Sequence, residues 1–245
     1  MITIPAGRFI LGTVGEDRFA NSTERPAHEV VIENPFAVSR SAITEAQWSA
    51  FAGGPSSSLP VVRVNWWEAM KYVAWLSAQT GNSFRLLTEA EWEYACRAGS
   101  TSIFNAGDTL EPEHANYFYD EHGFKVGPGH RTPPGSYPPN AFGLEDMHGN
   151  VCEWVADAWR ASYDAAPDEA HRVIRGGAWD YMPRLLRSAW RDFATPDTKR
   201  DNLGFRIACE SLVNGHKSLG FTAMLSLRIK PSDFDSRLCF VSRNQ

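Results

Sequence analysis

A stretch of about forty residues, from Ser100 to Pro139, is the feature that most constrains how this chain can fold. Glycine, proline, asparagine and aromatic residues dominate the stretch, and no helical or strand periodicity runs through it. Irregular segments of this length are uncommon inside compact domains, because they lack the hydrogen-bond ladders of helices and sheets. Packed tryptophan side chains or a bound metal ion are the natural means of holding such a segment in place.

Tryptophan is abundant, with nine copies in 245 residues. Buried aromatic side chains supply a large apolar area per residue, which a domain with little regular structure needs. We therefore expect most of the tryptophans to belong to the scaffold. Only Trp179 and Trp190 remain as candidates for ligand contact.

Composition argues against several classes of protein. The net charge of −5 argues against nucleic-acid binding, which requires a basic surface. No apolar run approaches the roughly 18 residues of a membrane-spanning helix, and no signal peptide is visible. The four cysteines are scattered without a CxxC pair, which excludes a zinc ribbon and favours buried thiols. We expect a cytoplasmic protein that binds neither nucleic acid nor membrane.

Local signals predict three helices among strand-like segments. Thr44 and Thr88 each begin a capping box, with Gln47 and Glu91 three residues further on, and Asn65 can cap the helix between them. The glutamates at 89, 91 and 93 are therefore interpreted as the first turns of a capped helix rather than as a catalytic acidic cluster. Strand-like segments occur at residues 7–12, 29–32, 36–38, 173–179 and 203–208.

Six short motifs occur in an order typical of one family. They are IPAGRF at 4–9, PVVRVNW at 60–66, FRLLTEAEWEYA at 84–95, MHGNVCEW at 147–154, RGGAW at 175–179 and GFR at 204–206. Together they resemble the formylglycine-generating enzyme (sulfatase-modifying factor) family over residues 2–209. The resemblance implies an α+β domain at residues 1–210, with the complex C-type-lectin-like fold and little regular secondary structure. Residues 211–245 form a C-terminal extension of unknown role, in which 224–229 could add a strand.

Formylglycine-making members of this family resemble copper-dependent oxidases with two closely spaced cysteines before the Gly-Phe-Arg block. This chain has no cysteine between Ala178 and Arg206, and Cu(I) requires soft ligands such as thiolates. We therefore expect neither copper nor formylglycine synthesis. The favoured function is a ligand-binding, protein-binding or accessory domain, as in the family's non-catalytic variable proteins. The alternative is an oxidase or oxygenase of the family, acting on a thiol or peptide substrate with an unassigned metal centre.

The resemblance also implies structural calcium. One site would use the side chains of Asn150 and Glu153 with the Val151 carbonyl, and a second would use Asn116 with the Tyr117 carbonyl. Both sets offer the hard oxygen ligands that Ca²⁺ prefers. The alternative is that Asn150 and Glu153 only satisfy backbone groups of a turn.

The segment before the Gly-Phe-Arg block occupies the place of the family's binding groove. Aromatic and arginine side chains there suit a protein or peptide ligand, and otherwise the segment is an ordinary surface loop. The candidate contacts are Trp179, Asp180, Tyr181, Arg184, Arg187 and Trp190.

Four arginines have two possible roles. They are Arg175, Arg187, Arg191 and Arg206. Their guanidinium groups suit carboxylates or peptide carbonyls of a ligand. Alternatively, they pair inside the core with Glu91, Glu153 or Asp157. His148 is expected to be structural rather than a catalytic base.

Overall fold

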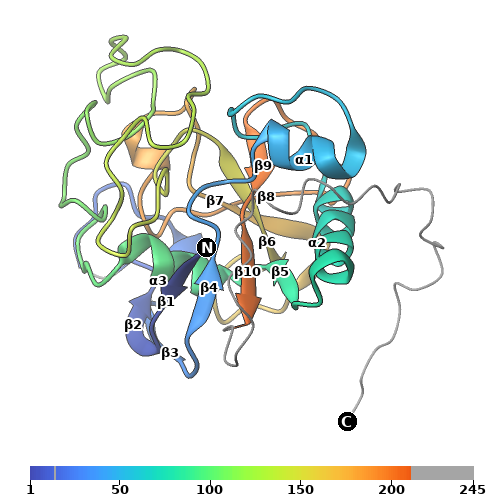
Figure 1. The fold of residues 1–245 in the computed structure, drawn as a ribbon. Coiled ribbons are helices and arrows are strands. Elements are labelled where there is room, and N and C mark those ends of the chain that lie inside the picture. Colours follow the sequence, from blue (N-terminus) through green and yellow to red (C-terminus); the bar gives the residue numbers. More distant parts are fainter. Residues whose placement is uncertain (14, 211–245) are drawn as a thin grey trace.

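The computed structural model describes residues 1–13 and 15–210, in which short strands form three sheets (Figure 1). The first sheet has the order β1 (Ile2–Ile4), β4 (Phe36–Val38), β10 (Ile207–Glu210) and β5 (Phe84–Leu86), with all neighbours antiparallel. The second pairs β2 (Gly7–Leu11) with β3 (His28–Ile32). The third has the order β8 (Asp192–Ala194), β7 (Asp168–Arg175), β6 (Cys152–Trp159) and β9 (Leu203–Phe205), with β9 parallel to β6. The predicted C-terminal extension, residues 211–245, lies outside the described part of the chain. The strand predicted at 224–229 falls within it.

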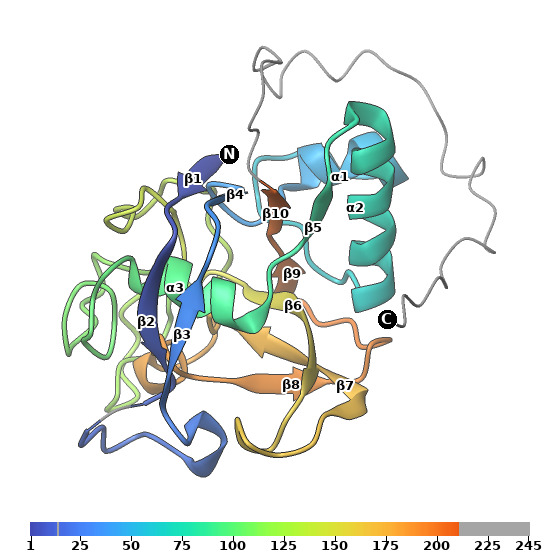
Figure 2. The ribbon, with the colours of Figure 1, turned by 90° about the horizontal axis from the view of Figure 1, so that it is seen from below.

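The three predicted helices are confirmed. They are α1 (Glu45–Ala52), α2 (Trp66–Thr80) and α3 (Glu89–Arg97), and each begins with a complete capping box. In α2 the Asn65 side chain accepts from the backbone N–H of Glu68, whose carboxylate accepts from Asn65 in return. Figures 1 and 2 show α1 and α2 together on one side of the molecule, opposite the irregular loops that follow α3. Two short 3₁₀ helices, η1 (Ser22–Glu24) and η2 (Pro183–Leu185), complete the elements of the described residues.

Of the four strands that the sequence did not predict (β1, β5, β6 and β8), β6 is the longest. Its first four residues, Cys152 to Val155, are all buried, so the strand lacks the alternation that marks a half-exposed one. It lies between β7 and β9, and its side chains enter two different apolar clusters of the core. The 147–154 motif therefore leads directly into the centre of the fold.

Residues 100–139, all of which are described, form no helix and no strand, as predicted. An apolar cluster of Phe104, Leu110, Ala115 and Tyr117 with Leu186 anchors this segment. Tryptophan does not supply the anchor, contrary to one of the two expectations. The cluster joins the loops to the η2 region near the C-terminal end of the domain.

Most tryptophans are scaffold, as expected. The buried ones are Trp66, Trp75, Trp92, Trp154, Trp159 and Trp190. Three of these donate long-range hydrogen bonds: Trp66 Nε1 to the Val155 carbonyl, Trp154 Nε1 to the Val64 carbonyl and Trp92 Nε1 to Glu153. Their indole groups thus tie β6 to the start of α2 and to α3.

Buried arginines form ion pairs, and all of these except the Arg97–Glu93 pair within α3 connect distant parts of the chain. The pairs are Arg97–Glu93, Arg175–Glu89, Arg175–Glu93, Arg187–Asp17, Arg187–Glu24, Arg191–Glu89 and Arg206–Glu153. The core role is confirmed, but the expected partners are wrong except Glu153. Glu91 pairs with Arg85, and Asp157 accepts from the backbone N–H of Glu89.

The described residues contain no helix that is long and apolar enough to cross a membrane.

Candidate ligand-binding cleft

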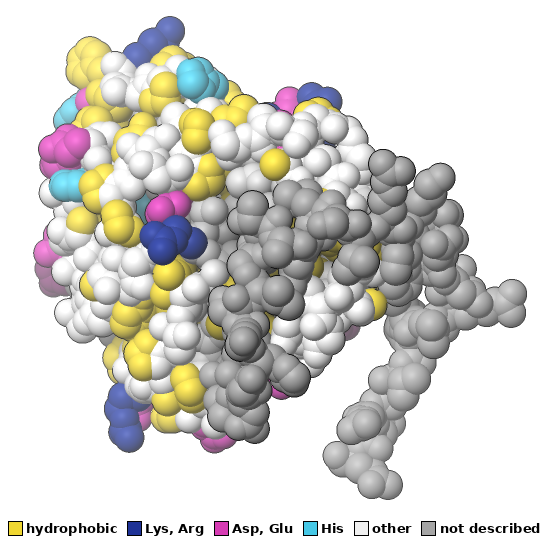
Figure 3. Space-filling view, viewed as in Figure 1, with side chains coloured by type: hydrophobic (Ala, Val, Ile, Leu, Met, Phe, Trp, Pro, Cys, Tyr) yellow, Lys and Arg dark blue, Asp and Glu magenta, His cyan; other side chains and the backbone are white. Residues whose placement is uncertain are grey.

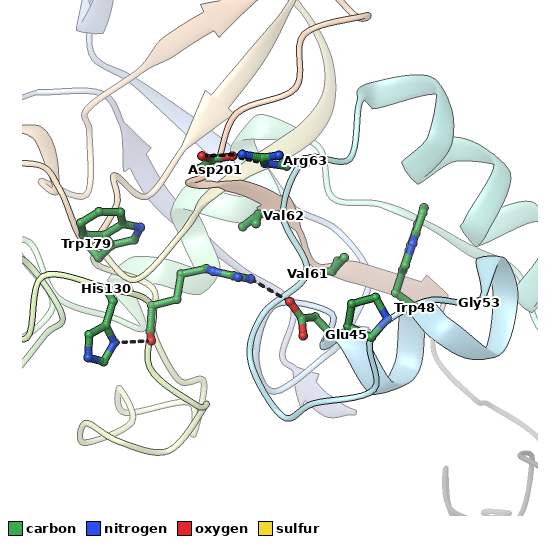
Figure 4. A pocket seen from close by; sticks show the side chains of 11 residues that line it. Glu45, Trp48, Gly53, Val61, Val62, Arg63, His130, Trp179 and Asp201 are labelled. Carbon is green, nitrogen blue, oxygen red and sulfur yellow. Dashed lines mark hydrogen bonds and ion pairs between the residues drawn. The ribbon is translucent and has the colours of Figure 1, made fainter.

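A cleft of about 520 Å³ opens between α1, the segment that precedes α2 and the two irregular segments around residues 130 and 179 (Figure 4). Its lining includes Trp48 and Glu45 from α1, Arg63, Trp179 and Asp201. These residues come from four separate stretches of sequence. The cleft is therefore a product of the tertiary fold.

Backbone hydrogen bonds hold the wall formed by residues 60–63 in place. The Val61 N–H donates to the Ile43 carbonyl at 2.7 Å, and the Arg63 N–H donates to the Arg200 carbonyl at 3.0 Å. A Cβ at Gly204 would lie 2.3 Å from the Val61 carbonyl oxygen, so only glycine permits this close approach. Arg63 has a φ of +58°, a strained conformation for a residue with a side chain.

Two ion pairs flank the cleft. Arg63 forms two hydrogen bonds with Asp201, and both side chains are more than half exposed. The hydrogen bonding raises the pKa of Arg63 and lowers that of Asp201. Arg131 donates to Glu45 at 3.3 Å and also to the Pro60 carbonyl. Positive and negative charges on the lining are thus balanced in pairs.

Among the residues that line this cleft, Trp179 has a buried polar group without a hydrogen-bond partner in the described chain. Its indole Nε1 is buried and has no hydrogen-bond acceptor within the described residues. Figure 4 shows this nitrogen on the side of the ring that faces Val62 across the cleft. Trp48, on the other wall, is held by stacking on Tyr72 with ring centroids 5.6 Å apart. A buried N–H without an acceptor is costly, so a ligand oxygen placed there would relieve the cost.

The other predicted ligand contacts lie elsewhere. Asp180 is exposed and accepts two hydrogen bonds from the Asn202 amide at 2.9 and 3.2 Å. Tyr181 is half-buried against the buried Trp190, and burial raises the pKa of its hydroxyl. Arg184 and Arg187 line a second cleft.

Sequence reasoning missed most of the residues that form the first cleft. These are Glu45, Trp48, Arg63, Arg131 and Asp201. The block at 60–66 is the one signal that pointed to this wall, since it belongs to the family motifs.

Asn150 and Glu153, which were predicted to bind calcium, form hydrogen bonds to other protein groups. The Asn150 side-chain oxygen accepts from the Asn116 amide at 3.1 Å and from the Thr132 N–H at 3.0 Å. Both Glu153 oxygens are engaged by Arg206, and one also by Trp92. The alternative, in which the side chain satisfies backbone groups of a turn, thus fits Asn150. Glu153 instead forms an ion pair with Arg206.

Asp146 is the unpredicted oxygen donor next to Asn150. Both of its carboxylate oxygens are buried without a hydrogen-bond partner among the described residues, as is the Asn116 side-chain oxygen. Burial raises the pKa of Asp146 to about 7, against the opposing influence of Asn150 and Arg206. No three His, Cys, Asp or Glu side chains of the described chain gather as metal ligands. A cation here would therefore rest on Asp146 with amide and carbonyl oxygens, a donor set that fits Ca²⁺.

A family model for the sulfatase-modifying factor enzyme 1-like domain matches residues 54–211. The chain belongs to this family. Formylglycine-generating enzyme from Bos taurus is 33% identical over 189 residues, covering 65% of this chain but 48% of the relative. The chain thus spans about half the length of that enzyme. Inactive C-alpha-formylglycine-generating enzyme 2 from Bos taurus is 28% identical over 276 residues, covering 85% and 87% of the two chains.

The solved structure of PvdO from Pseudomonas aeruginosa superimposes with a TM-score of 0.76 at 34% identity, covering 85% of this chain and 93% of that one. The α+β fold of the sulfatase-modifying factor family is thereby established, as the motifs predicted. The relatives include both an enzyme and a protein named as inactive, so family membership alone does not fix an activity.

Three cysteines of this sulfatase-modifying factor domain are described, and all are buried away from the two clefts. Burial raises the pKa of Cys96 to about 12 and also raises that of Cys152, so both remain thiols at neutral pH. His148 lies 3.7 Å from the Cys96 sulfur. Its Nδ1 donates to the Leu186 carbonyl at 2.7 Å, its Nε2 accepts from the Asn105 N–H, and burial lowers its pKa to about 4. Its contacts are those of a structural histidine.

Proposed function

We propose that this sulfatase-modifying factor domain is a binding or accessory module that takes a protein or peptide ligand in the cleft lined by Trp179. The observation that carries the proposal is the unpartnered indole N–H of Trp179, which faces the cleft. A peptide carbonyl is a suitable acceptor, and Trp48 offers an aromatic wall for a neighbouring side chain. The exposed Arg63–Asp201 pair can exchange partners with polar groups of the ligand.

A binding role is also supported by the state of the cysteines. Thiolate is the form that binds copper or attacks a substrate, and the described thiols are buried and protonated. The segment from Ala178 to Arg206, which supplies Trp179 to the cleft, contains no cysteine. Oxygen consumption by the purified full chain with a thiol or peptide substrate would favour the oxidase alternative instead.

The test uses peptides selected from a random 12-residue display library on the full chain, each then measured by fluorescence polarisation. Trp179→Ala should weaken binding about tenfold or more, because a hydrogen bond and an aromatic contact are both lost. Trp179→Phe, which removes the donor but keeps a ring, should weaken it about two- to tenfold. Trp67→Ala is the matched control, since Trp67 is exposed and outside the cleft. Selected peptides that all bind Trp179→Ala as well as the natural chain would overturn the proposal.

We further infer that Ca²⁺ binds beside Asn150, with Asp146 as its carboxylate ligand and the Val151 carbonyl and Asn116 oxygen as further donors. Support comes from the buried, unpartnered oxygens of Asp146 and Asn116. A cation that binds only the folded chain raises the melting temperature with its concentration. Asp146→Asn should abolish most of the Ca²⁺-induced shift, whereas the exposed Asp197→Asn should keep it. Equal melting temperatures of the natural chain in Ca²⁺ and in chelator would contradict this inference.

A further inference from the structure

A second cleft, of about 640 Å³, lies on the irregular side of the molecule. Its walls come from the loop at residues 16–19, the segments at 103–112 and 117–126, and residues 183–187. Phe104, Leu110 and Tyr117 are buried members of the apolar cluster that anchors these loops, and they line the cleft. The floor is therefore apolar and fixed by the packing of the loops themselves.

Carboxylates dominate the charged groups of this cleft. Its lining has six of them against three arginines: Glu16, Asp17, Asp108, Glu111, Asp120, Glu121, Arg18, Arg184 and Arg187. Arg187 is neutralised by Asp17 at 2.8 Å and by Glu24, and Arg184 is paired with Glu121 at 3.5 Å. Arg18 is then the one lining cation without a carboxylate partner in the described chain, against the four carboxylates at 16, 108, 111 and 120.

The excess of negative charge affects Tyr117, which lies at the floor of the cleft. The pKa of Tyr117 is raised to about 12, first by burial and then by nearby carboxylates that include Glu111 and Asp120. Figure 3 shows acidic side chains along the left edge of the molecule, the side on which the irregular loops lie in Figure 1. A cation in the cleft would meet a favourable potential above an apolar floor.

Aromatic rings in the wall add a second attraction for cations. The guanidinium of Arg18 lies 4.5 Å from the centre of the Phe19 ring, and that of Arg184 lies 5.9 Å from it. The Phe19 ring is thus already occupied by guanidinium groups of the chain itself, and a ligand cation would meet the other rings of the lining. Phe104 and Tyr117 bring two further rings to the lining.

We propose that this second cleft binds a basic peptide segment through an arginine or lysine side chain. The apolar stem of that side chain lies over the floor of Phe104, Leu110 and Tyr117, and its charged end meets Asp108 and Glu111 at the mouth. Arginine and lysine combine an apolar stem with a cationic end, which matches this distribution of groups. The cleft has its own lining and does not depend on the one that contains Trp179.

The experiment measures a fluorescein-labelled Arg-Leu-Arg-Lys amide by fluorescence polarisation with the full chain. The double variant Asp108→Asn, Glu111→Gln should weaken binding about tenfold and reduce its dependence on salt. Asp108 is exposed and keeps an acceptor for the Ile103 N–H as asparagine, and Glu111 is exposed, so both changes preserve the fold. The control double variant Glu33→Gln, Asp197→Asn makes the same charge change at exposed positions outside the cleft and should alter binding less than twofold.

Equal weakening in both double variants would assign the binding to net charge and overturn the proposal. So would no weakening in either, or spermine binding as tightly as the peptide, because the apolar floor would then contribute nothing. Trp179→Ala should leave this probe unaffected. Failure here and failure of the function proposed for the first cleft are thus separately visible.

Discussion

Arg206 is the residue whose replacement by methionine tests the ion-pair scaffold most directly. It is fully buried, donates to the two Glu153 oxygens at 2.6 and 2.8 Å, and donates to the Glu145 carbonyl at 3.0 Å. Methionine fills similar space without a donor, which leaves the buried Glu153 carboxylate with Trp92 as its remaining partner. Removing one member of a buried ion pair costs about 3–5 kcal/mol. We expect Arg206→Met to lower the free energy of unfolding by that amount.

The assay is urea denaturation at neutral pH, with the midpoint and slope compared between variants. Because a domain of this kind is stable by about 5–15 kcal/mol, Arg206→Met leaves only part of that margin. The double variant Glu153→Gln, Arg206→Met has no unpaired charge and keeps an acceptor for Trp92. It should therefore be more stable than Arg206→Met alone. A loss below about 1 kcal/mol for the single variant, or a double variant that loses the sum of the two single effects, would refute this reasoning.

Two further predictions concern the α3 cap and the buried thiols. Thr88→Ala should lower the free energy of unfolding by about 1 kcal/mol, because the Glu91 N–H loses its acceptor, and the exposed Thr101→Ala should leave it unchanged in the same urea titration. Cys96 and Cys152 should resist Ellman's reagent in the native chain at pH 8 and react in guanidinium chloride, since burial raises the pKa of both thiols. Rapid native labelling of either cysteine, mapped by peptide mass spectrometry, would contradict the buried assignment.

Features set by neighbouring residues could be predicted from the sequence, whereas features set by distant ones could not. Each capping box lies within four residues, so the starts of α1, α2 and α3 follow from local chemistry. The Arg187–Glu24 pair joins residues 163 positions apart, and no local pattern indicates which carboxylate an arginine will meet. Strand β6 was missed because burial on both faces removes the alternation that identifies a strand.

The residues of the candidate site also fall into those indicated by a local motif and those brought together by the fold. Trp179 was predicted from a motif and does line the first cleft, but Trp48 and Arg63 reach it from elements far away in sequence. The left-handed conformation of Arg63 and the close approach of Gly204 to the Val61 carbonyl are likewise visible only in the folded structure. The sequence also did not indicate Asp146, because the burial of its carboxylate without a hydrogen-bond partner depends on residues that the fold brings around it.

The buried arginines explain how one irregular segment can be both rigid and available for binding. Arg175 and Arg206 stand at the two ends of the segment that carries Trp179 and Asp201, and both are fully buried in ion pairs with α3 and β6. Arg187 and Arg191, within it, clamp the segment to the loop at residues 17–24 and to α3. Between these clamps, Trp179, Arg184 and Asp201 line the two clefts without joining the buried ion pairs. Their side chains are consequently free to determine which ligand is bound while the scaffold remains intact.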